Sequence, residues 1–377
     1  MNKYKNKGCI GAALLGALVL FSASGCASNG REEIWRGDKK ITVLDSKTPS
    51  EAVNTSLAGD FSIEKIDRYE GVRGEDWLGD ESILITRENQ ELEPIRVFDQ
   101  MSLIRNMYSY DLKSGEEKPM SEKTEYIWAP IVSPDGRHIF YERFEAGKYT
   151  GLISDLEGNV KAAVDTDAAK GFALSFDQAM WTDNEEVVVP SSGEGVCLIN
   201  VNSKVTEIEG IGRMQTDRAV KVRDKIYYIS TDRNLVEYDI ASKQSKAVKD
   251  NVLDFELSPE KDMFAIQKKV GESRNVLVLT DLAGSEKETL AEAKAIFGIS
   301  WSPDQGRLAY LMTSEDESKS GLHVMDLKSK EDLYVSRDFL NADNGLKWSP
   351  SGKKILASIG EVKDMKVIDN TYVVTIN

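Results

Sequence analysis

Cysteine is scarce in this 377-residue chain, which holds three: Cys9, Cys26 and Cys197. Cys9 and Cys26 lie in or beside an N-terminal apolar segment, so Cys197 is alone in the rest of the chain. A single thiol excludes an internal disulfide, and the fold must therefore hold by packing and hydrogen bonding. Cys197 sits between Val196 and Leu198, where we expect it to serve as a small buried hydrophobe.

Histidine and the short motifs of common catalytic sites are also lacking. The two histidines, His138 and His323, fall in different repeat units (described below), so we predict no shared metal or acid–base role, and we expect His138 to face solvent. The chain has no Gly-x-Ser-x-Gly turn, Walker-type loop, His-Glu-x-x-His or Cys-x-x-Cys motif. Only 28 residues follow Ser349, too few for an α/β-hydrolase domain. We therefore predict no cofactor and no metal, and name no catalytic residue.

Positive charge is in short supply. The formal net charge is -15, and 45 basic against 63 acidic residues remain once residues 1–25, with Lys3, Lys5 and Lys7, are set aside. A surface this negative repels phosphate backbones and anionic headgroups. The composition therefore argues against a nucleic-acid partner, and solubility alone is the simplest use of the charge.

Long apolar runs are absent except at the start. Residues 10–23 are apolar but shorter than the roughly 20 residues of a membrane-spanning helix. They follow three lysines and precede Ser24, Gly25 and Cys26, the order of a secretory signal. The tetrapeptide at residues 23–26 resembles the bacterial lipobox, although Ala23 stands where leucine is commoner.

The lipobox resemblance implies that Cys26 is lipidated and becomes the first mature residue. Two or more acyl chains there would hold the protein stably on the outer face of the cell membrane. Residues 1–25 are then a lipoprotein signal peptide, and residues 26–60 are a lipidated N-terminus and polar tether. A plain cleaved signal, with Cys26 incidental, is the alternative.

One pattern recurs seven times after residue 70: a large apolar residue, a short polar turn and a β-branched or aromatic run. The leading residues, which we call anchors, are Trp77, Val132, Trp181, Val222, Leu257, Trp301 and Trp348. Their spacings average about 45 residues, the length of a four-stranded propeller blade. A second motif, an acid or amide followed by an aliphatic residue, comes after each of the first six anchors, at Asp111, Asp155, Asn200, Asp239, Asp281 and Asp326.

The residue types suit such blades. Four of the turns carry a proline, which cannot donate to a ladder and so ends an inner strand, and two carry an acid–glycine or serine–glycine pair suited to a tight hairpin. No stretch has a long apolar stripe at helical period. Residues 281–295 are the best helical candidate, but their register assigns them to an outer strand and loop.

The Trp-Ser-Pro-Asp and apolar-Asp-Leu motifs resemble the repeats of TolB-type propellers and of the propeller domain in prolyl oligopeptidase-like enzymes. With the lipobox, the layout resembles uncharacterised propeller lipoproteins of Gram-positive bacteria. The resemblance covers roughly residues 70–377 and implies an all-β propeller. The seven anchors predict a single propeller of seven four-stranded blades over residues 61–377, with six as the alternative if one weak unit is only an elaborated loop. The seventh unit lacks a fourth strand, so we predict that an N-terminal strand, from residues 41–47 or 61–69, closes the ring.

Tryptophan and one long loop are the remaining candidates for a site. Four of the five tryptophans in the units occupy the anchor position, which favours core packing over a stacking platform for sugars. The connection from Arg87 to Ile104 is far longer than its counterparts, and Arg96 and Phe98 within it combine a cation with an aromatic ring. We take these two residues as a candidate ligand-face loop.

The predicted function is a non-enzymatic binding module, held on the membrane by its lipid, for a protein or a cell-wall component. The alternative is an enzyme acting on envelope polysaccharide or peptide, with rim carboxylates as acid and base. A sensory ectodomain without its own signalling partner is a third hypothesis. Two carboxylates about 5–10 Å apart in a central pocket would favour the enzyme, whereas a channel lined only by small and apolar residues would exclude it.

Overall fold

The computed structural model describes residues 31–36, 39–44, 61–97, 100–145, 147–165, 174–192, 194–342, 345–363 and 366–377. Residues 1–50 and 51–377 form separate compact units. In the first, β1 (Arg31–Arg36) pairs with β2 (Lys39–Leu44) as an antiparallel hairpin. In the part of the chain that is described, no helix is long and apolar enough to cross a membrane.

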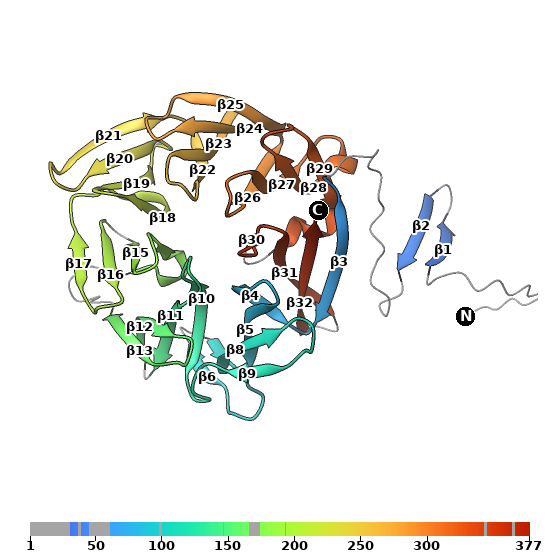
Figure 1. Ribbon diagram of the computed structural model, residues 1–377, viewed down its shortest axis with the longest axis horizontal. Helices are drawn as coiled ribbons and strands as arrows, with labels where there is room; N and C mark the ends of the chain where they lie inside the picture. The colour runs from blue at the N-terminus through green and yellow to red at the C-terminus, as the bar shows by residue number, and fades with distance from the viewer. Residues whose placement is uncertain are drawn as a thin grey trace, which may run out of the picture. The chain divides into compact units, whose positions relative to one another are not determined.

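The second unit is a ring of seven four-stranded antiparallel sheets, as the repeats predict, and the six-blade alternative is wrong (Figure 1). Blade 1 contains β4 (Arg73–Gly79), β5 (Ser82–Glu88), β8 (Arg105–Asp111) and β9 (Glu117–Pro119). Blade 2 contains β10 (Tyr126–Val132), β11 (His138–Glu145), β12 (Lys148–Asp155) and β13 (Val160–Asp165). Blade 3 contains β14 (Met180–Trp181), β15 (Glu186–Pro190), β16 (Val196–Asn200) and β17 (Val205–Ile208). Blade 4 contains β18 (Met214–Val222), β19 (Lys225–Ser230), β20 (Leu235–Asp239) and β21 (Gln244–Lys249). Blade 5 contains β22 (Val252–Leu257), β23 (Met263–Gly271), β24 (Arg274–Asp281) and β25 (Glu286–Ala293). Blade 6 contains β26 (Ala295–Trp301), β27 (Arg307–Thr313), β28 (Gly321–Asp326) and β29 (Asp332–Ser336). The helical candidate at 281–295 is the outer strand β25, as its register predicts.

Blade 7 closes the ring with chain from both ends of the propeller. It joins β30 (Lys347–Trp348), β31 (Lys354–Lys363) and β32 (Lys366–Ile376) to β3 (Ile63–Glu70), which pairs along β32. The predicted N-terminal closing strand is therefore confirmed, and it is the second of the two candidate segments. Residues 41–44 of the first candidate lie in β2 instead.

The antiparallel register gives the ring two faces. In blade 2, Tyr126 pairs with Phe144 near the β11–β12 turn, whereas Val132 pairs with Ile139 at the other end. We call the face with the β11–β12 turn and the connections between blades the mouth face, and the opposite one the base face. Strand β3 begins on the base face, where Ile63 pairs with Ile376, and it ends on the mouth face.

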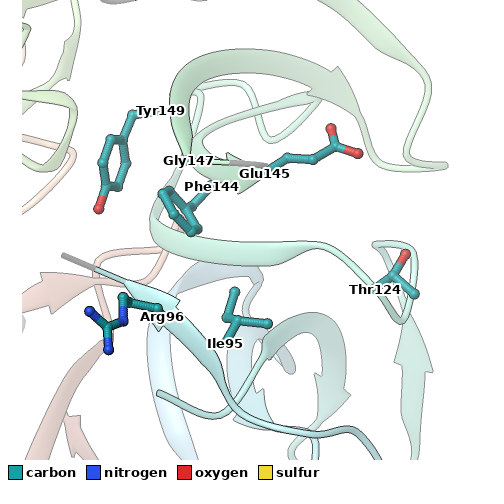
Figure 2. Close-up of a pocket in the computed structure, with 7 residues that line it drawn as sticks. All are labelled: Ile95, Arg96, Thr124, Phe144, Glu145, Gly147 and Tyr149. Atoms are coloured by element: carbon teal, nitrogen blue, oxygen red, sulfur yellow. The ribbon is translucent and has the colours of Figure 1, made fainter. Parts of the chain in front are cut away.

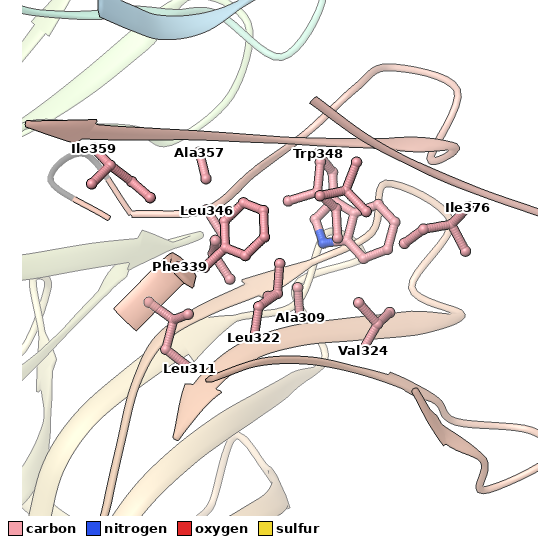
Figure 3. Close-up of a cluster of buried hydrophobic side chains, with 12 residues drawn as sticks. Ala309, Leu311, Leu322, Val324, Phe339, Leu346, Trp348, Ala357, Ile359 and Ile376 are labelled. Atoms are coloured by element: carbon pink, nitrogen blue, oxygen red, sulfur yellow. The ribbon is translucent and has the colours of Figure 1, made fainter. Parts of the chain in front are cut away.

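The core is divided into seven apolar clusters, one between each pair of neighbouring blades. Between blades 6 and 7, Phe339 and Trp348 pack against the aliphatic side chains of β27, β28 and β31 (Figure 3). Strands buried on both faces need continuous apolar runs, which explains the β-branched and aromatic segments after each anchor.

The anchor tryptophans also bond one blade to the one before it. The indole nitrogen of Trp77 donates to the carbonyl oxygen of Lys347 in blade 7, at 2.9 Å. Trp181, Trp301 and Trp348 donate in the same way to the inner strand of the preceding blade, with acceptors Ile131, Glu256 and Ser300. Core packing is confirmed for Trp77, Trp301 and Trp348, which are buried; Trp181 is half-buried.

The remaining scarce residues have structural roles. Cys197 is 1% exposed, and burial raises the pKa of its thiol to about 12, so it stays protonated and unreactive at neutral pH. His323 in blade 6 is bonded at both ring nitrogens, to Asp332 at 2.9 Å and to the carbonyl oxygen of Lys319 at 2.8 Å. His138 in blade 2 is half-buried near the ring of Trp181 and does not simply face solvent, because the anchor of blade 3 packs beside it.

Candidate functional site

The innermost strand of each blade faces the axis of the ring (Figure 1). Residues of these strands line a cavity of about 560 Å³. Unlike a channel of small and apolar residues, it carries charged side chains from five of the seven blades. The charged lining side chains are Arg73, Glu75, Arg105, Asp177, Arg218, Asp254, Glu256 and Lys347. This cavity is the first part of the candidate site, and it leaves the enzymatic alternative open.

One repeat position supplies the cavity with several of its side chains. The residue four places before the anchor is Arg73 in blade 1, Trp128 in blade 2, Asp177 in blade 3 and Arg218 in blade 4, and all four line the cavity. In blade 2 a β-bulge follows Trp128, where Ala129 has a φ of 47°. A bulge turns side chains away from the regular pleat, which explains why this position faces the axis.

Arginines neutralise most of the carboxylates. At the junction of blades 7 and 1, Arg73 reaches Glu75 at 3.2 Å and Asp369 at 3.3 Å, and Arg105 reaches Glu88 at 3.2 Å. Burial raises the pKa of Glu75, while Arg73 and the bonded hydroxyl of Thr86 oppose that rise. These groups form a compensated network rather than a free charge.

A second compensated group lies between blades 4 and 5. Arg218 pairs with Asp254, at 2.9 Å, and also with Glu256. Its guanidinium carbon lies 5.8 Å from the centre of the Phe255 ring. Both carboxylates therefore share the guanidinium of Arg218 as their cation.

The side of the mouth formed by blades 2 and 3 differs, because within the described residues no ion pair reaches its carboxylates. Glu142 on β11 is half-buried, and among the described residues no hydrogen bond or ion pair reaches its carboxylate. Burial raises the pKa of Glu142 to about 7, and the negative charge of Asp177 adds to the effect. Asp177 is exposed and accepts a hydrogen bond from the amide of Gln178 at 3.0 Å.

Trp128 stands beside this carboxylate. It pairs with Glu142 in the register of β10 and β11, so the two side chains lie on the same side of the sheet. Its side chain is 40% exposed, in contrast to the buried anchors. The guanidinium carbon of Arg105 lies 6.0 Å from the centre of its ring. Trp128 is thus an accessible aromatic surface in the cavity wall.

The second part of the site is a groove of about 540 Å³ on the same face, between blades 1 and 2. The long connection in blade 1 folds as a separate hairpin, β6 (Ile95–Val97) with β7 (Gln100–Ser102). Figure 2 shows Ile95 and Arg96 of this hairpin on one side of the groove, with Phe144 and Tyr149 of blade 2 across from them.

Local contacts hold the walls of the groove. The rings of Phe144 and Tyr149 lie 4.8 Å apart between their centres, on the two strands that flank the β11–β12 turn. Asn106, which is buried, donates through its amide to the carbonyl oxygens of Glu122 and Glu125, at 3.1 and 2.9 Å. It thereby fixes the connection that carries Thr124 into the lining.

Of the residues singled out from the sequence, Arg96 lines this groove and is exposed. Phe98 and Cys26 lie outside the described residues, so the ligand-face loop and the lipidation site stay predictions. Trp128 and Glu142 were not among the site residues predicted from the sequence. The sequence held a signal for each of them. Trp128 is the one tryptophan of the repeat units that does not occupy an anchor position. Glu142 is an acid at a repeat position where the other units carry an uncharged residue, namely Thr86, Pro190, Ile229, Gln267, Leu311 and Ser358.

The uncompensated carboxylate gives a pH-dependent prediction. Because the pKa of Glu142 rises from 4.5 to about 7 on folding, the folded state binds the extra proton, and stability falls as pH rises through 7. Each pKa unit changes the free energy of unfolding by ~1.4 kcal/mol, and the partial exposure of Glu142 reduces the total effect. Glu142→Gln should therefore stabilise the protein by about 1–2 kcal/mol at pH 8 and not at pH 4.5. Denaturant unfolding at both values measures this. The exposed Glu157, changed to Gln, is the control; an equal gain from both variants at pH 8 contradicts the prediction.

The comparisons with known proteins bear on the fold. No family model matches the chain, and no curated protein sequence matches it. Among solved structures, an uncharacterised protein of Listeria monocytogenes EGD-e aligns at a TM-score of 0.57, with 13% identity, over 82% of this chain and 92% of its own.

Two enzymes are also similar in structure. An oligogalacturonate lyase in complex with manganese aligns at a TM-score of 0.55 with 13% identity, over 84% of this chain and 93% of its own. One of two prolyl endopeptidases aligns at 0.51 with 11% identity, over 88% of this chain and 48% of its own. In the described part of this chain, no three His, Cys, Asp or Glu side chains group as a metal site. These likenesses confirm the predicted propeller, of the kind found in uncharacterised bacterial proteins and in prolyl endopeptidases.

Proposed function

We propose that this protein is a lipid-anchored binding module on the outer side of the cell membrane, which meets its ligand or partner through the mouth face. The observation that carries the proposal is the placement of the site. The cavity with its charged groups and the groove beside Arg96 open on one face, and β3 enters the ring on the other.

The first strand of the propeller, β3, begins on the base face. A tether that starts at a lipidated Cys26 therefore joins the ring on the face opposite the cavity mouth, since Ile63 at the start of β3 pairs with Ile376. This arrangement leaves the mouth free to meet a soluble ligand, a protein or the cell wall. Rim loops held by a rigid scaffold commonly carry binding.

The experiment has two arms in cells that produce the full chain. In the first, radiolabelled palmitate is expected to label the protein, which should sediment with membranes, and Cys26→Ala should remove both the label and the sedimentation. In the second, a photo-crosslinking amino acid replaces Arg96 on the mouth face or Val160, which is 49% exposed at the base-face end of β13. We expect a discrete crosslinked band at position 96 and none at 160.

If the wild-type chain takes up no palmitate label but still forms the crosslink at position 96, the lipid anchor is refuted and the mouth face remains the binding face. Equal crosslinking at both positions, or none at either, would contradict the binding role. The two parts of the proposal are therefore tested separately.

An enzyme acting on envelope polysaccharide is the second candidate, and Glu142 is the observation that favours it. A carboxyl with a pKa of about 7 near a second carboxylate suits a general acid at neutral pH. If the protein cleaves purified cell-wall polysaccharide, new reducing ends should form with the wild type and not with Glu142→Gln. The similarity to oligogalacturonate lyases, at 13% identity, adds only the fold.

A further inference from the structure

We infer that the side of the cavity mouth formed by Trp128, Glu142 and Asp177 binds an alkylammonium group, either of a small amine or of a lysine side chain on a partner. The inference deepens the proposed binding function by naming the ligand chemistry, and it rests on that function. We call these three side chains the ammonium site. Trp128 and Asp177 line the cavity of about 560 Å³, and Glu142 is the cross-strand partner of Trp128.

The aromatic surface is the first argument. An aromatic ring attracts a cation over its face, most strongly when the ring is tryptophan. Trp128 is 40% exposed within the cavity, although every other tryptophan of the described blades packs between sheets and bonds through its indole nitrogen. The guanidinium carbon of Arg105 lies 6.0 Å from the Trp128 ring centre, at the outer limit of a cation–π contact.

Charge complementarity is the second argument. Arg105 does not neutralise Glu142, because it pairs with Glu88 and lies 4.0 Å from Asp369. The neighbouring Arg143 pairs with Glu125 at 2.9 Å. Tyr126, which lies near Glu142, is uncharged at neutral pH, since burial raises its pKa above the ordinary value. The charged group that acts on Glu142 is Asp177, and it is also negative.

Geometry combines the two arguments. Trp128 and Glu142 are direct cross-strand partners, whose Cβ atoms stand about 5 Å apart in such pairs. A cation between the ring and the two carboxylates gains the attraction of the aromatic face and an ion pair with Glu142, which no cation of the described residues reaches. An anionic ligand is repelled there by the two carboxylates and by the aromatic face.

Fluorescence titration of the full chain at pH 8 tests the inference, because Trp128 itself reports on the site. The probe is n-butylammonium chloride, with sodium chloride and sodium butyrate as controls for ionic strength and for an anion. We expect a saturable change with a Kd of about 1 mM for butylammonium and none for butyrate. Glu142→Gln should weaken binding about tenfold, and Trp128→Leu should remove the fluorescence change and weaken binding seen by calorimetry.

Lowering the pH protonates Glu142, so affinity should fall through pH 7 in the wild type and stay flat in Glu142→Gln. Tighter binding of acetyl-Gly-Lys-Gly-amide than of butylammonium assigns the cation to a partner's lysine, and the reverse assigns it to a free amine. Both results support the site. Butylammonium binding that Glu142→Gln leaves unchanged, or no binding at 20 times the expected Kd, about 20 mM, overturns it.

The outcome separates this inference from the proposed function. Crosslinking at position 96 without ammonium binding leaves the mouth face as the binding face and refutes only the ligand class. Ammonium binding without crosslinking at position 96 supports the ligand class and refutes the proposed role of the mouth face in binding a partner. Circular dichroism of each variant shows whether it is folded, and Glu157→Gln is the charge-matched control on the base face.

Discussion

A chain that begins at residue 71 is expected to lose its single cooperative unfolding transition, whereas one that begins at residue 51 should keep it. The shorter chain lacks β3, so β32 loses its outer partner and blade 7 is left with three strands. An unpaired edge of this kind also promotes aggregation. Thermal unfolding followed by circular dichroism measures the difference.

A peptide of residues 61–70 provides the control for this truncation. Added to the chain that begins at residue 71, it should pair along β32 and restore a cooperative transition, as in strand addition between chains. A shorter chain that unfolds like the longer one, with the same midpoint, would show that β3 does not close the ring.

The second large effect is expected for the anchor tryptophans. Trp77→Ala should destabilise the protein by about 3–5 kcal/mol, because it removes a buried ring between blades 7 and 1, and loss of the indole bond to the Lys347 carbonyl adds about 1 kcal/mol. Trp128→Ala, the same substitution at an exposed position, should cost less than about 1 kcal/mol.

Denaturant unfolding of the two variants side by side measures this contrast. Trp77→Phe should fall between them, since it keeps most of the apolar ring and loses the hydrogen bond. Equal losses for Trp77→Ala and Trp128→Ala would mean that the anchor position does not join neighbouring blades.

The fold was accessible from the sequence because its repeats report local events. A proline or an acid–glycine pair ends or turns a strand wherever it stands, and the missing fourth strand of the seventh unit requires a partner from elsewhere. The choice between residues 41–47 and 61–69 was not accessible, because both have β-forming residues. The structure decides it through the pairing of Ile66 with Val374 and of its neighbours along β32.

The site was less accessible, because it depends on distances between blades. Arg96 stood out through the length of its loop, and it does line a groove, but its partners Phe144 and Tyr149 come from the next blade. Glu142 looked like one acid among 63. Its meaning appears only when Arg105 and Arg143, the nearby cations, are seen to pair elsewhere.

The crystal structure of the full chain grown with n-butylammonium chloride at pH 8 tests most directly whether the mouth of the ring is a ligand site. We predict density for the ammonium over the Trp128 ring, with its nitrogen within hydrogen-bond reach of the Glu142 carboxylate. A mouth without bound amine, or amine bound only on the base face, would contradict that claim.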